Sequence, residues 1–352
     1  MSEPRRVLLA MSGGVDSSVA GGLLRAAGHE VVGVTLHLWD AEGEAKVGRC
    51  CAPEDRRDAR RSADVLGIPH YVLDEREAFA RDVVEPFVRE YRAGRTPSPC
   101  VHCNRTVKLT YLMQVADRFG CSHVATGHYA RVERRPHGHA LLRGRDRHKD
   151  QSYFLFGLES EDLPRLLFPL GELLKRQSRE AARELGLPNA EKPDSQELCF
   201  VPDGDVAAFV ARRAGVSAGG EIVDQDGEVL GRHRGVEGFT VGQRRGLGLG
   251  GGPVRYVLRV LAQERRVVVG PAEALRSSEL EATGARWLNP PDELEFAAEV
   301  RIRYRHTPAS AHVRRTSTGF IARFLEPQRA ITPGQAAVVY RGEEVLGGGF
   351  IL

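Results

Sequence analysis

Short apolar runs alternate with amphipathic stretches along the first part of the chain. The apolar runs have the length of buried strands, and the amphipathic stretches repeat apolar positions every three or four residues, as helices do. We expect strands at residues 7–10, 30–39, 69–73 and 123–132, and helices at residues 54–66, 79–93, 105–119 and 175–185. Strands that alternate with helices predict an α/β fold with a doubly wound parallel sheet.

The pattern changes near residue 203. From residue 219 onward, glycine-rich turns separate short alternating segments, which predict a small and mostly β domain that ends near residue 275. Further alternating runs fit a compact antiparallel barrel. They lie at residues 297–305, 311–315, 320–324, 336–340 and 344–350. We therefore expect three domains, at residues 1–203, 204–275 and 276–352.

Composition limits the class of protein. The 352 residues are 41% hydrophobic and 28% charged, which is typical of a globular protein. The net charge of +3 permits a nucleic-acid partner but does not demand one. The apolar segment behind the N-terminal arginines is too short for a secretion signal, and no stretch approaches the length of a membrane span. Six cysteines are too few for a secreted disulfide framework, so we expect a cytoplasmic protein with no membrane association.

The strongest local motif is SGGVDSS at residues 12–18, between the first predicted strand and the helix that follows it. Gly13 and Gly14 let the backbone approach a ligand closely, and the serines add hydroxyl donors. The N–H groups and the dipole at a helix N-terminus favour an anion, so the motif predicts a phosphate site. No lysine follows the glycines, which separates the motif from the GxxxxGKS/T loop. The alternative is an ordinary turn without a ligand.

The pattern SGGxDS resembles the pyrophosphate loop of the ATP pyrophosphatases. These enzymes split ATP between its α and β phosphates and adenylate an oxygen of the substrate. The residues by themselves predict a phosphate site, and the resemblance further implies which reaction takes place there.

Two cysteines lie in a proline-rich segment, residues 96–104. The prolines predict a loop that presents Cys100 and Cys103 ahead of the helix at residues 105–119. A thiolate close to a helix N-terminus is stabilised, so we expect Cys103 to be an effective nucleophile. Cys199 follows a second irregular segment. The remaining thiols are expected to be buried or incidental, and they are Cys50, Cys51 and Cys121.

Motifs spread over essentially the whole chain resemble those of one family, the bacterial tRNA-specific 2-thiouridylases of the MnmA type. They are SGGVDSS at residues 12–18, PCVHCN at 99–104, ATGHYAR at 125–131, KDQSYFL at 149–155, DSQELCF at 194–200, GFTVGQRRGLG at 238–248 and RIRYRH at 301–306. Several are specific to that family rather than to the wider ATP pyrophosphatases. The resemblance implies an adenine nucleotide alpha hydrolase-like catalytic domain, a small central domain and a C-terminal barrel, the last two in contact with tRNA.

The resemblance implies a reaction that replaces the C2 oxygen of the wobble uridine in certain tRNAs with sulfur. ATP with Mg²⁺ would adenylate that oxygen first, because AMP is a better leaving group than a carbonyl oxygen. Cys199 would carry sulfur as a persulfide, and Cys103 would attack it and leave a Cys103–Cys199 disulfide that needs reduction. Asp16 is carried over as a third catalytic residue. The implied ATP contacts are Ala10, Met11, Ser12, Gly13, Gly14, Val15, Asp16, Ser17, Leu36 and Gly127.

The same resemblance implies that the partner is the anticodon stem-loop of a tRNA, whose target base flips out of its stack. The implied tRNA contacts are Ser98, Pro99, Cys100, Lys149, Asp150, Gln151, Arg303 and Tyr304. Basic tracts at residues 131–149, 244–245 and 301–305 fit a groove for RNA phosphates, and about half of such positions are expected to be ordinary solvated surface. Tyr304 has a simpler alternative, which is packing within a strand.

Two further expectations concern partners. A persulfide donor, either a cysteine desulfurase or a sulfur-relay protein, would have to recharge Cys199. We expect a monomer, because three domains around one RNA leave no obvious self-complementary face.

One position departs from part of the family. Cys100 stands where some members carry an aspartate that is proposed to act as an acid or base. Cys100, Cys103 and Cys199 supply three thiolates, which fit a 4Fe-4S cluster with one iron open to sulfide. Cluster chemistry and cluster-free persulfide chemistry are both open at this point. A structural zinc would need a fourth ligand, and His102 would point away if the segment is extended.

Two other classes of function share part of these features. An amide-forming ligase of the ATP pyrophosphatase class has the loop at residues 12–18 but gives no reason for Cys103 and Cys199. A non-catalytic RNA-binding protein with a structural metal would keep the basic tracts. Conversion of ATP to AMP that depends on tRNA would exclude the second alternative.

Overall fold

The computed structural model describes residues 3–40, 53–136, 138–194, 198–201, 204–215 and 217–352. The chain divides into two compact units. The first unit comprises Met1–Val83, Cys100–Gly204 and Glu343–Val345, and the second comprises Val84–Pro99, Asp205–Gly342 and Leu346–Leu352.

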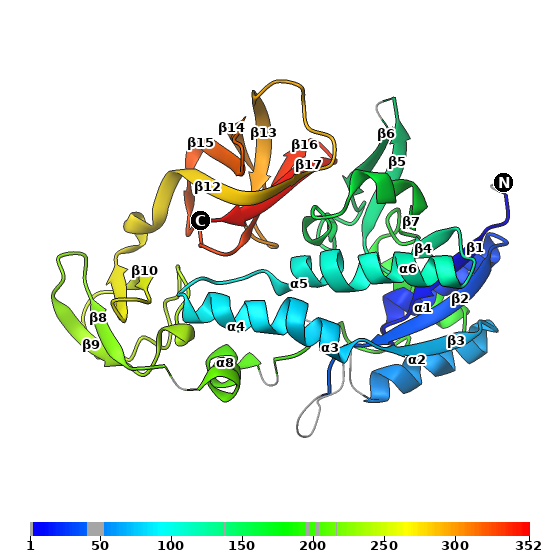
Figure 1. Cartoon of the computed structure of the whole chain (residues 1–352), viewed down its shortest axis with the longest axis horizontal. Helices are drawn as coiled ribbons and strands as arrows, with labels where there is room; N and C mark the ends of the chain where they lie inside the picture. Colours follow the sequence, from blue (N-terminus) through cyan, green and yellow to red (C-terminus); the bar gives the residue numbers. More distant parts are fainter. Residues whose placement is uncertain (1–2, 41–52, 137, 195–197, 202–203, 216) are drawn as a thin grey trace. The chain divides into compact units, whose positions relative to one another are not determined.

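A five-stranded parallel sheet organises the first unit (Figure 1). Its strand order is β3-β2-β1-β4-β7, and every neighbouring pair runs parallel. The strands are β1 (Arg6–Ala10), β2 (Glu30–His37), β3 (His70–Asp74), β4 (His123–Ala125) and β7 (Leu166–Leu167). The predicted parallel sheet is therefore confirmed, with β1 at its centre.

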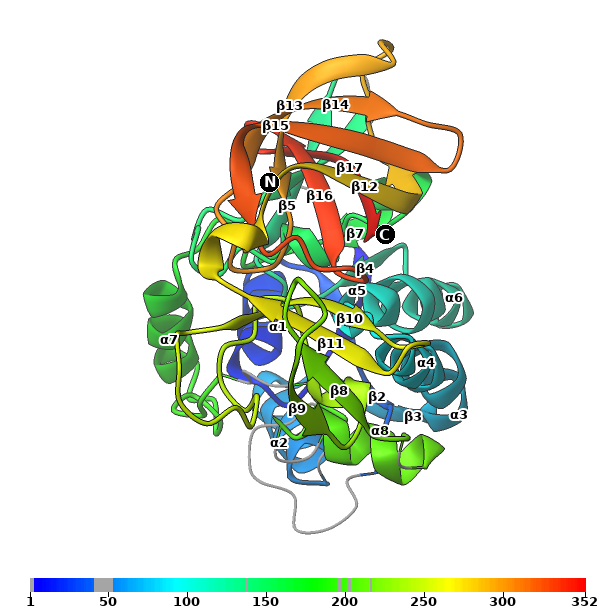
Figure 2. The ribbon, with the colours of Figure 1, turned by 90° about the vertical axis from the view of Figure 1, so that its left-hand side faces the viewer.

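Helices cover both faces of this sheet, as a doubly wound fold requires. Figure 2 shows α1 and α7 on the opposite side of the strands from α6. The helical segments are α1 (Val15–Ala26), α2 (Pro53–Leu66), α3 (Arg76–Phe79), η1 (Ala80–Val84), α5 (Pro99–His102), η2 (Cys103–Leu109), α6 (Thr110–Arg118), η3 (Ser152–Phe154), η4 (Ser160–Arg165) and α7 (Lys175–Glu184). Of these, η1 and η2 are π-helical, and η3 and η4 are 3-10 helices.

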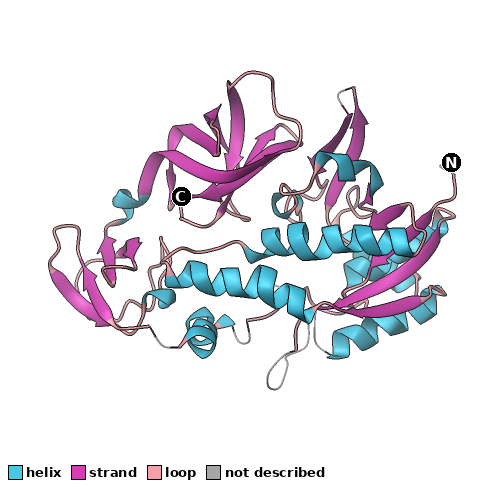
Figure 3. Cartoon of the chain, in the orientation of Figure 1, coloured by secondary structure: helices cyan, strands magenta, loops and turns pink. Residues whose placement is uncertain are grey.

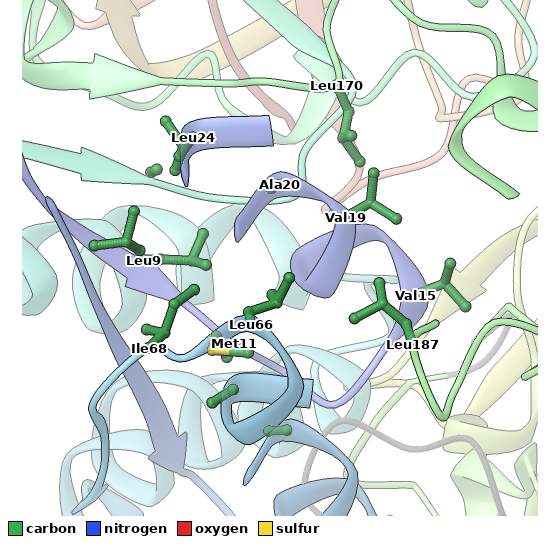
Figure 4. Packing of buried hydrophobic residues seen from close by; sticks show 14 of the residues in the cluster. Leu9, Met11, Val15, Val19, Ala20, Leu24, Leu66, Ile68, Leu170 and Leu187 are labelled. Carbon is green, nitrogen blue, oxygen red and sulfur yellow. The ribbon is translucent and has the colours of Figure 1, made fainter. Parts of the chain in front are cut away.

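The core of the first unit lies between β1 and the helices α1, α2 and α7. Figure 4 shows Leu9 of β1 and Met11, the residue just after β1, packed near Val19 of α1 and Leu66 of α2. Alternate residues of β1, Val7 and Leu9, belong to this core. Leu8 is fully buried as well, which is expected for a strand that is covered on both faces.

The segment at residues 96–104 differs from the expectation. A loop was predicted through this range, but α5 begins at Pro99 and continues without interruption through η2 into α6. Proline fits the first position of a helix, because the N–H that it lacks has no partner inside the helix there. Cys100 and Cys103 therefore lie on a helix, and only the residues before Pro99 form the predicted loop.

The strand predicted at residues 123–132 is two strands. β4 ends at Ala125, and β5 (Ala130–Arg135) forms an antiparallel hairpin with β6 (Gly138–Arg143). The turn between β4 and β5 places Gly127 against the start of α1, where a straight strand could not reach. Much of the first basic tract therefore lies on this hairpin rather than on the central sheet, with Arg134 and Arg135 exposed.

The second unit consists mainly of strands (Figure 3). A four-stranded sheet has the order β10-β11-β8-β9, and its core includes Ile222, Val257 and Val267. The strands are β8 (Gly220–Val223), β9 (Val229–His233), β10 (Tyr256–Leu261) and β11 (Arg266–Gly270), and the helical segments are α4 (Glu85–Arg92), α8 (Val206–Ala214), η6 (Val236–Gly238) and η7 (Ala272–Leu275). The sequence prediction missed α8, whose Phe209 packs edge-on against Phe87 of α4 at 6.1 Å.

Six antiparallel strands close the C-terminal barrel in the order β12-β15-β14-β13-β16-β17. Closure follows because β12 pairs with β15 at one edge and with β17 at the other. The strands are β12 (Arg276–Trp287), β13 (Glu295–Arg301), β14 (Ala309–Arg315), β15 (Gly319–Arg329), β16 (Ala336–Arg341) and β17 (Glu344–Ile351). The predicted barrel is confirmed, and β12 is the strand that the sequence pattern did not reveal.

No helix in the described part of the chain is both long enough and apolar enough to cross a membrane.

Candidate active site

The loop between β1 and α1 has the geometry of a tight cradle. Gly13 has φ of +76°, and a Cβ atom at this residue would lie 2.0 Å from the backbone oxygen of Asp55. Only glycine fits both constraints. Ser17 closes the loop from inside the helix, since its hydroxyl donates to the Gly14 carbonyl at 3.0 Å and accepts from the Ser12 N–H at 3.1 Å. The first N–H groups of α1 point out of the helix end, as an anion site needs.

Two other expected ATP contacts lie beside this loop along the carboxyl edge of the sheet. A Cβ atom on Gly127 would lie 2.7 Å from the Ser17 nitrogen and 2.8 Å from the Asp16 carbonyl carbon. Gly127 follows β4, the strand next to β1. Leu36 is half-buried near the end of β2, the neighbour of β1 on its other side. Parallel strands end at one edge, so residues distant in sequence converge there.

Lys175 supplies the cation that the loop sequence lacks. It is the first residue of α7, and its Nζ lies 2.8 Å from both carboxylate oxygens of Asp16. Tyr129 donates its hydroxyl to the same carboxylate at 2.9 Å. Burial, followed by the charge of Asp16, raises the pKa of Tyr129, which therefore stays protonated as a donor. Sequence analysis missed both residues, and the lysine at a predicted helix start was the available signal.

Asp194 gathers three cations around one carboxylate. Lys149 lies 2.7 Å from it, Lys175 lies 2.8 Å away and Arg179 lies 2.9 Å away. Burial opposes ionisation of Asp194, but hydrogen bonds from Lys149 and Lys175 outweigh burial and lower its pKa to about 2. Lys175 thus bridges the phosphate loop and the segment that leads to Cys199.

A second lysine, Lys192, contacts the backbone of the loop. Lys192 is largely buried, and its Nζ lies within 2.6 Å of Asp58 and also contacts Asp55 at 2.5 Å and the Gly13 carbonyl at 3.3 Å. Burial disfavours the charged amine, but hydrogen bonds to the two carboxylates raise the pKa of Lys192 overall. Asn189 donates to the same Gly13 carbonyl at 3.0 Å. The segment after α7 therefore fixes the position of the loop glycine.

The cysteines of the proposed chemistry differ in their surroundings. Cys100 is exposed, Cys199 is half-buried and Cys103 is buried at 5% exposure. Phe200, next to Cys199, packs at 6.3 Å from Trp39 and 5.6 Å from Phe79, which anchors this segment beyond the end of β2. Cys50 and Cys51 lie outside the described residues.

The donor set for an iron–sulfur cluster is not assembled. Across the residues that the structure describes, no three His, Cys, Asp or Glu side chains are grouped so that they could hold a metal ion. Cys100, Cys103 and Cys199 all belong to these residues. The three thiols therefore do not fit a cluster or a structural zinc in this conformation.

The expected tRNA contacts of the first unit make intramolecular contacts. Lys149 pairs with Asp194. Asp150 is buried and accepts N–H groups from Gly144 and Ser152, both at 3.1 Å. Gln151 accepts the Tyr129 N–H at 3.0 Å. These bonds hold the segment next to the phosphate loop.

The expected tRNA contacts of the second unit lie near a cavity of about 350 Å³. Arg303 and Arg329 line it together with threonine hydroxyls and Gln335, and the described lining residues include no carboxylate. Both arginines are exposed. Arg303 donates to the Arg329 carbonyl at 3.2 Å, and the Arg301 guanidinium stacks on the half-buried Tyr304 ring. The cavity therefore has the positive lining that a phosphate would need.

Ser98 and Pro99 are buried at the junction between loop and helix. The Ser98 hydroxyl accepts the Ala336 N–H at 3.2 Å. Pro99 is the first residue of α5. The Ser98 hydrogen bond therefore fixes the residue that immediately precedes the helix carrying Cys100 and Cys103.

A parallel α/β sheet with a serine- and glycine-rich phosphate loop after its first strand defines a class, the ATP-using enzymes of the pyrophosphatase fold. Family models agree with this class and narrow it. Residues 5–203 match the tRNA methyl transferase HUP domain, residues 207–271 the tRNA methyl transferase PRC-barrel domain, and residues 277–351 the aminomethyltransferase beta-barrel domain.

Curated relatives give the particular family. The tRNA-specific 2-thiouridylase MnmA of Sorangium cellulosum is 54% identical over 99% of this chain and 93% of that protein. The proteins of the same name from Geobacter metallireducens and Koribacter versatilis are 48% and 44% identical, over 99% and 100% of this chain and 96% and 100% of theirs. The chain belongs to the family of tRNA-specific 2-thiouridylases.

Solved structures give weaker similarities. The NMN synthetase of Francisella tularensis aligns with a TM-score of 0.34 and 18% identity over 54% of this chain and 66% of that chain. A predicted subunit of tRNA methyltransferase from Methanocaldococcus jannaschii aligns with a TM-score of 0.34 and 19% identity, over 51% and 76%.

Proposed function

We propose that this protein replaces the C2 oxygen of the wobble uridine of tRNA with sulfur, in a reaction that consumes ATP. The observation that carries the proposal is the convergence of Lys175 on Asp16 in the phosphate loop, in the same unit that holds Cys103 and Cys199. Relatives that match over nearly the whole chain are named tRNA-specific 2-thiouridylases. An amide-forming ligase would leave both cysteines without a role.

The nucleotide step uses the loop at the end of β1. The oxygen at C2 attacks the α-phosphorus of ATP, and pyrophosphate leaves toward the N–H groups of α1 and the Lys175 ammonium. The expected contacts along residues 10–17, with Leu36 and Gly127, surround the nucleotide from three neighbouring strands. Asp16 is the loop carboxylate that would hold a Mg²⁺ ion, which would neutralise charge on the triphosphate.

The sulfur step needs no metal. The Cys103 thiolate attacks the inner sulfur of a Cys199 persulfide, the Cys103–Cys199 disulfide forms, and hydrosulfide leaves. Hydrosulfide adds to C2 of the adenylated base and expels AMP, which gives 2-thiouridine. A dithiol must then reduce the disulfide with two electrons. Among the described residues, Cys100, Cys103 and Cys199 are not grouped as metal ligands, which supports this route over a cluster.

We assign tRNA recognition to basic residues of both units. Arg303, beside Tyr304, lines a cavity whose described lining residues include no carboxylate, which supports a phosphate contact there. Lys149 binds Asp194, which also binds the Lys175 that contacts Asp16, and residues 98–100 precede Cys103 in the chain. A base flipped out of the anticodon loop would enter between nucleotide and cysteines.

We further propose the organisation and partners of the enzyme. Separate family matches support a division into a catalytic domain at residues 1–203, a central domain at 204–275 and a barrel at 276–352. The protein acts as a monomer in the cytoplasm, where tRNA and reduced thiols are available. A cysteine desulfurase or sulfur-relay protein recharges the half-buried Cys199.

A thiolation assay tests the proposal. Purified protein is incubated with unmodified tRNA, ATP, Mg²⁺ and a persulfide donor, and nucleosides are analysed by mass spectrometry. We expect 2-thiouridine from the wild type and none from C103S or C199S, while C121A serves as a matched cysteine control. Absence of product from the wild type would reject the function, and equal loss in C121A would indicate misfolding.

A further inference from the structure

The CxxC pair lies on one helical stretch, with one thiol outside the protein and one inside. Cys100 belongs to α5 and Cys103 is the first residue of η2, while His102 between them has helical dihedral angles (φ −59°, ψ −47°). Residues three positions apart on a helix share a face, with Cβ atoms about 5–6 Å apart. A disulfide needs Cβ atoms about 4 Å apart, so a small local adjustment would join the two sulfurs.

The possible disulfides differ in how accessible their sulfurs are to solvent. A Cys103–Cys199 disulfide would offer an external reductant one buried and one half-buried sulfur. Thiol–disulfide exchange requires the attacking thiolate to reach a sulfur in line with the bond that breaks. A disulfide that includes the exposed Cys100 would present an accessible sulfur instead.

We propose that Cys100 is the resolving thiol of this enzyme, an inference that rests on the proposed function. After each sulfur transfer, the Cys100 thiolate attacks the Cys103 sulfur of the Cys103–Cys199 disulfide. That bond breaks, the Cys199 thiolate leaves, and a Cys100–Cys103 disulfide forms without net oxidation or reduction. A dithiol protein of the thioredoxin class then attacks Cys100, delivers two electrons and is itself oxidised to a disulfide.

This step explains why a buried nucleophile is paired with an exposed cysteine. Burial shelters Cys103 from solvent oxidants, and the exchange passes its oxidised state to the surface. Cys199 regains its thiolate at the same moment and is ready for a new persulfide.

Disulfide mapping after one turnover tests the step directly. Enzyme loaded with persulfide at Cys199 is mixed with tRNA, ATP and Mg²⁺ without reductant, quenched in acid, alkylated and digested. We expect a Cys100–Cys103 disulfide and alkylated Cys199 in the wild type, and a Cys103–Cys199 disulfide in C100S. A wild type that retains the Cys103–Cys199 disulfide with Cys100 alkylated would overturn the proposal.

A second measurement compares each variant with itself. The steady-state rate with a thioredoxin-class protein is divided by the rate with excess dithiothreitol, a small dithiol that reaches sheltered sulfurs. We expect C100S and C100D to lower this ratio by about tenfold relative to the wild type, because the protein reductant loses its exposed sulfur. C121A should keep the wild-type ratio.

The outcomes separate the two proposals. If 2-thiouridine forms but the ratio in C100S and C100D equals that of the wild type, Cys100 does not resolve the disulfide. If the wild type forms no 2-thiouridine, the proposed function fails, and the resolving step fails with it.

Discussion

Lys175 connects the phosphate loop to the segment that leads to Cys199. Its ammonium lies 2.8 Å from Asp16 and 2.8 Å from Asp194, and its side chain is only 15% exposed. A phosphate bound at the loop would compete with these two carboxylates for the Lys175 ammonium.

We expect Lys175→Ala to lower kcat/KM for ATP by about a hundredfold, because a positioned cation near the leaving pyrophosphate is lost. The measurement is tRNA-dependent AMP formation at varied ATP concentration. Arg183→Ala is the matched control, since Arg183 lies on the same helix but is exposed and pairs with Glu191. Similar rates for Lys175→Ala and Arg183→Ala would contradict a phosphate role for Lys175.

Asp194 makes stability depend on pH in a defined window. Its pKa in the folded protein is about 2, below the ordinary value of 3.8, so the carboxylate stabilises the fold above about pH 4. This contribution is lost as the pH falls through the folded pKa. Asp194→Asn should lower the free energy of unfolding by about 1–3 kcal/mol at pH 7, since Lys149, Lys175 and Arg179 each lose the charge of this carboxylate.

Urea unfolding of wild type and Asp194→Asn between pH 7 and pH 3 checks this expectation. The difference between the two proteins should be constant down to about pH 4 and should shrink below it. A difference that does not change with pH would show that the ionised carboxylate is not the stabilising group.

The loop and helix α1 form a single structural element whose shape depends on Gly13. Its positive φ and the close Asp55 carbonyl impose separate penalties on a larger residue. Gly28, just beyond α1, has φ of +84° but no heavy atom within 4 Å of an added Cβ. The two glycines thus separate backbone strain from steric overlap.

We expect Gly28→Ala to cost about 1 kcal/mol through its φ alone. Gly13→Ala should cost several kcal/mol, because a contact of 2.0 Å forces α2 away from the loop, and it should also abolish ATP binding. Thermal unfolding and ATP titration measure both effects. Equal costs for the two variants would mean that the loop moves freely and is no rigid cradle.

The helical stretch from Pro99 to Arg118 shows where sequence rules and structure diverge. Prolines at residues 97 and 99 indicated a loop, yet the second proline occupies the first helical position, where it is tolerated. Cys103 is therefore a buried residue of a helix rather than an exposed residue of a loop. Local propensity could not decide this, because Pro suits both a loop and a helix start.

The second unit has its own cluster of positive charge beside a cavity. Arg303 and Arg329 are exposed beside one cavity, and Arg329 stacks on Tyr256 at 4.8 Å. Arg329 is the last residue of β15, and Arg303 lies in the connection between β13 and β14. A contact to RNA phosphates there would set affinity for tRNA without changing the adenylation chemistry.

Arg303→Ala and Arg329→Ala should each weaken tRNA binding and reduce the slope of log K against log salt by about one, because each removes one phosphate contact. Filter binding at several salt concentrations gives the slope. Arg323→Ala is the control, because Arg323 is exposed on the barrel but pairs with Glu279. An unchanged slope in the first two variants would place the RNA elsewhere.

The linear pattern of residues was enough to predict the parallel α/β sheet, the loop at residues 12–18 and five of the six barrel strands. These depend on local periodicity and on glycines at fixed positions, which a linear pattern records. It also supplied the cysteines as chemical candidates, because residue type alone carries that information.

Which distant side chains meet depends on tertiary packing. Lys175 and Lys192 contact the loop, and Asp194 binds Lys175, because parallel strands end at one edge and the chain returns there after α7. No periodicity encodes such a long-range pairing, and an isolated lysine in a sequence is usually solvated surface. The burial of Cys103 beside an exposed Cys100 is likewise a property of packing, since the two residues occupy one helical stretch but meet different surroundings.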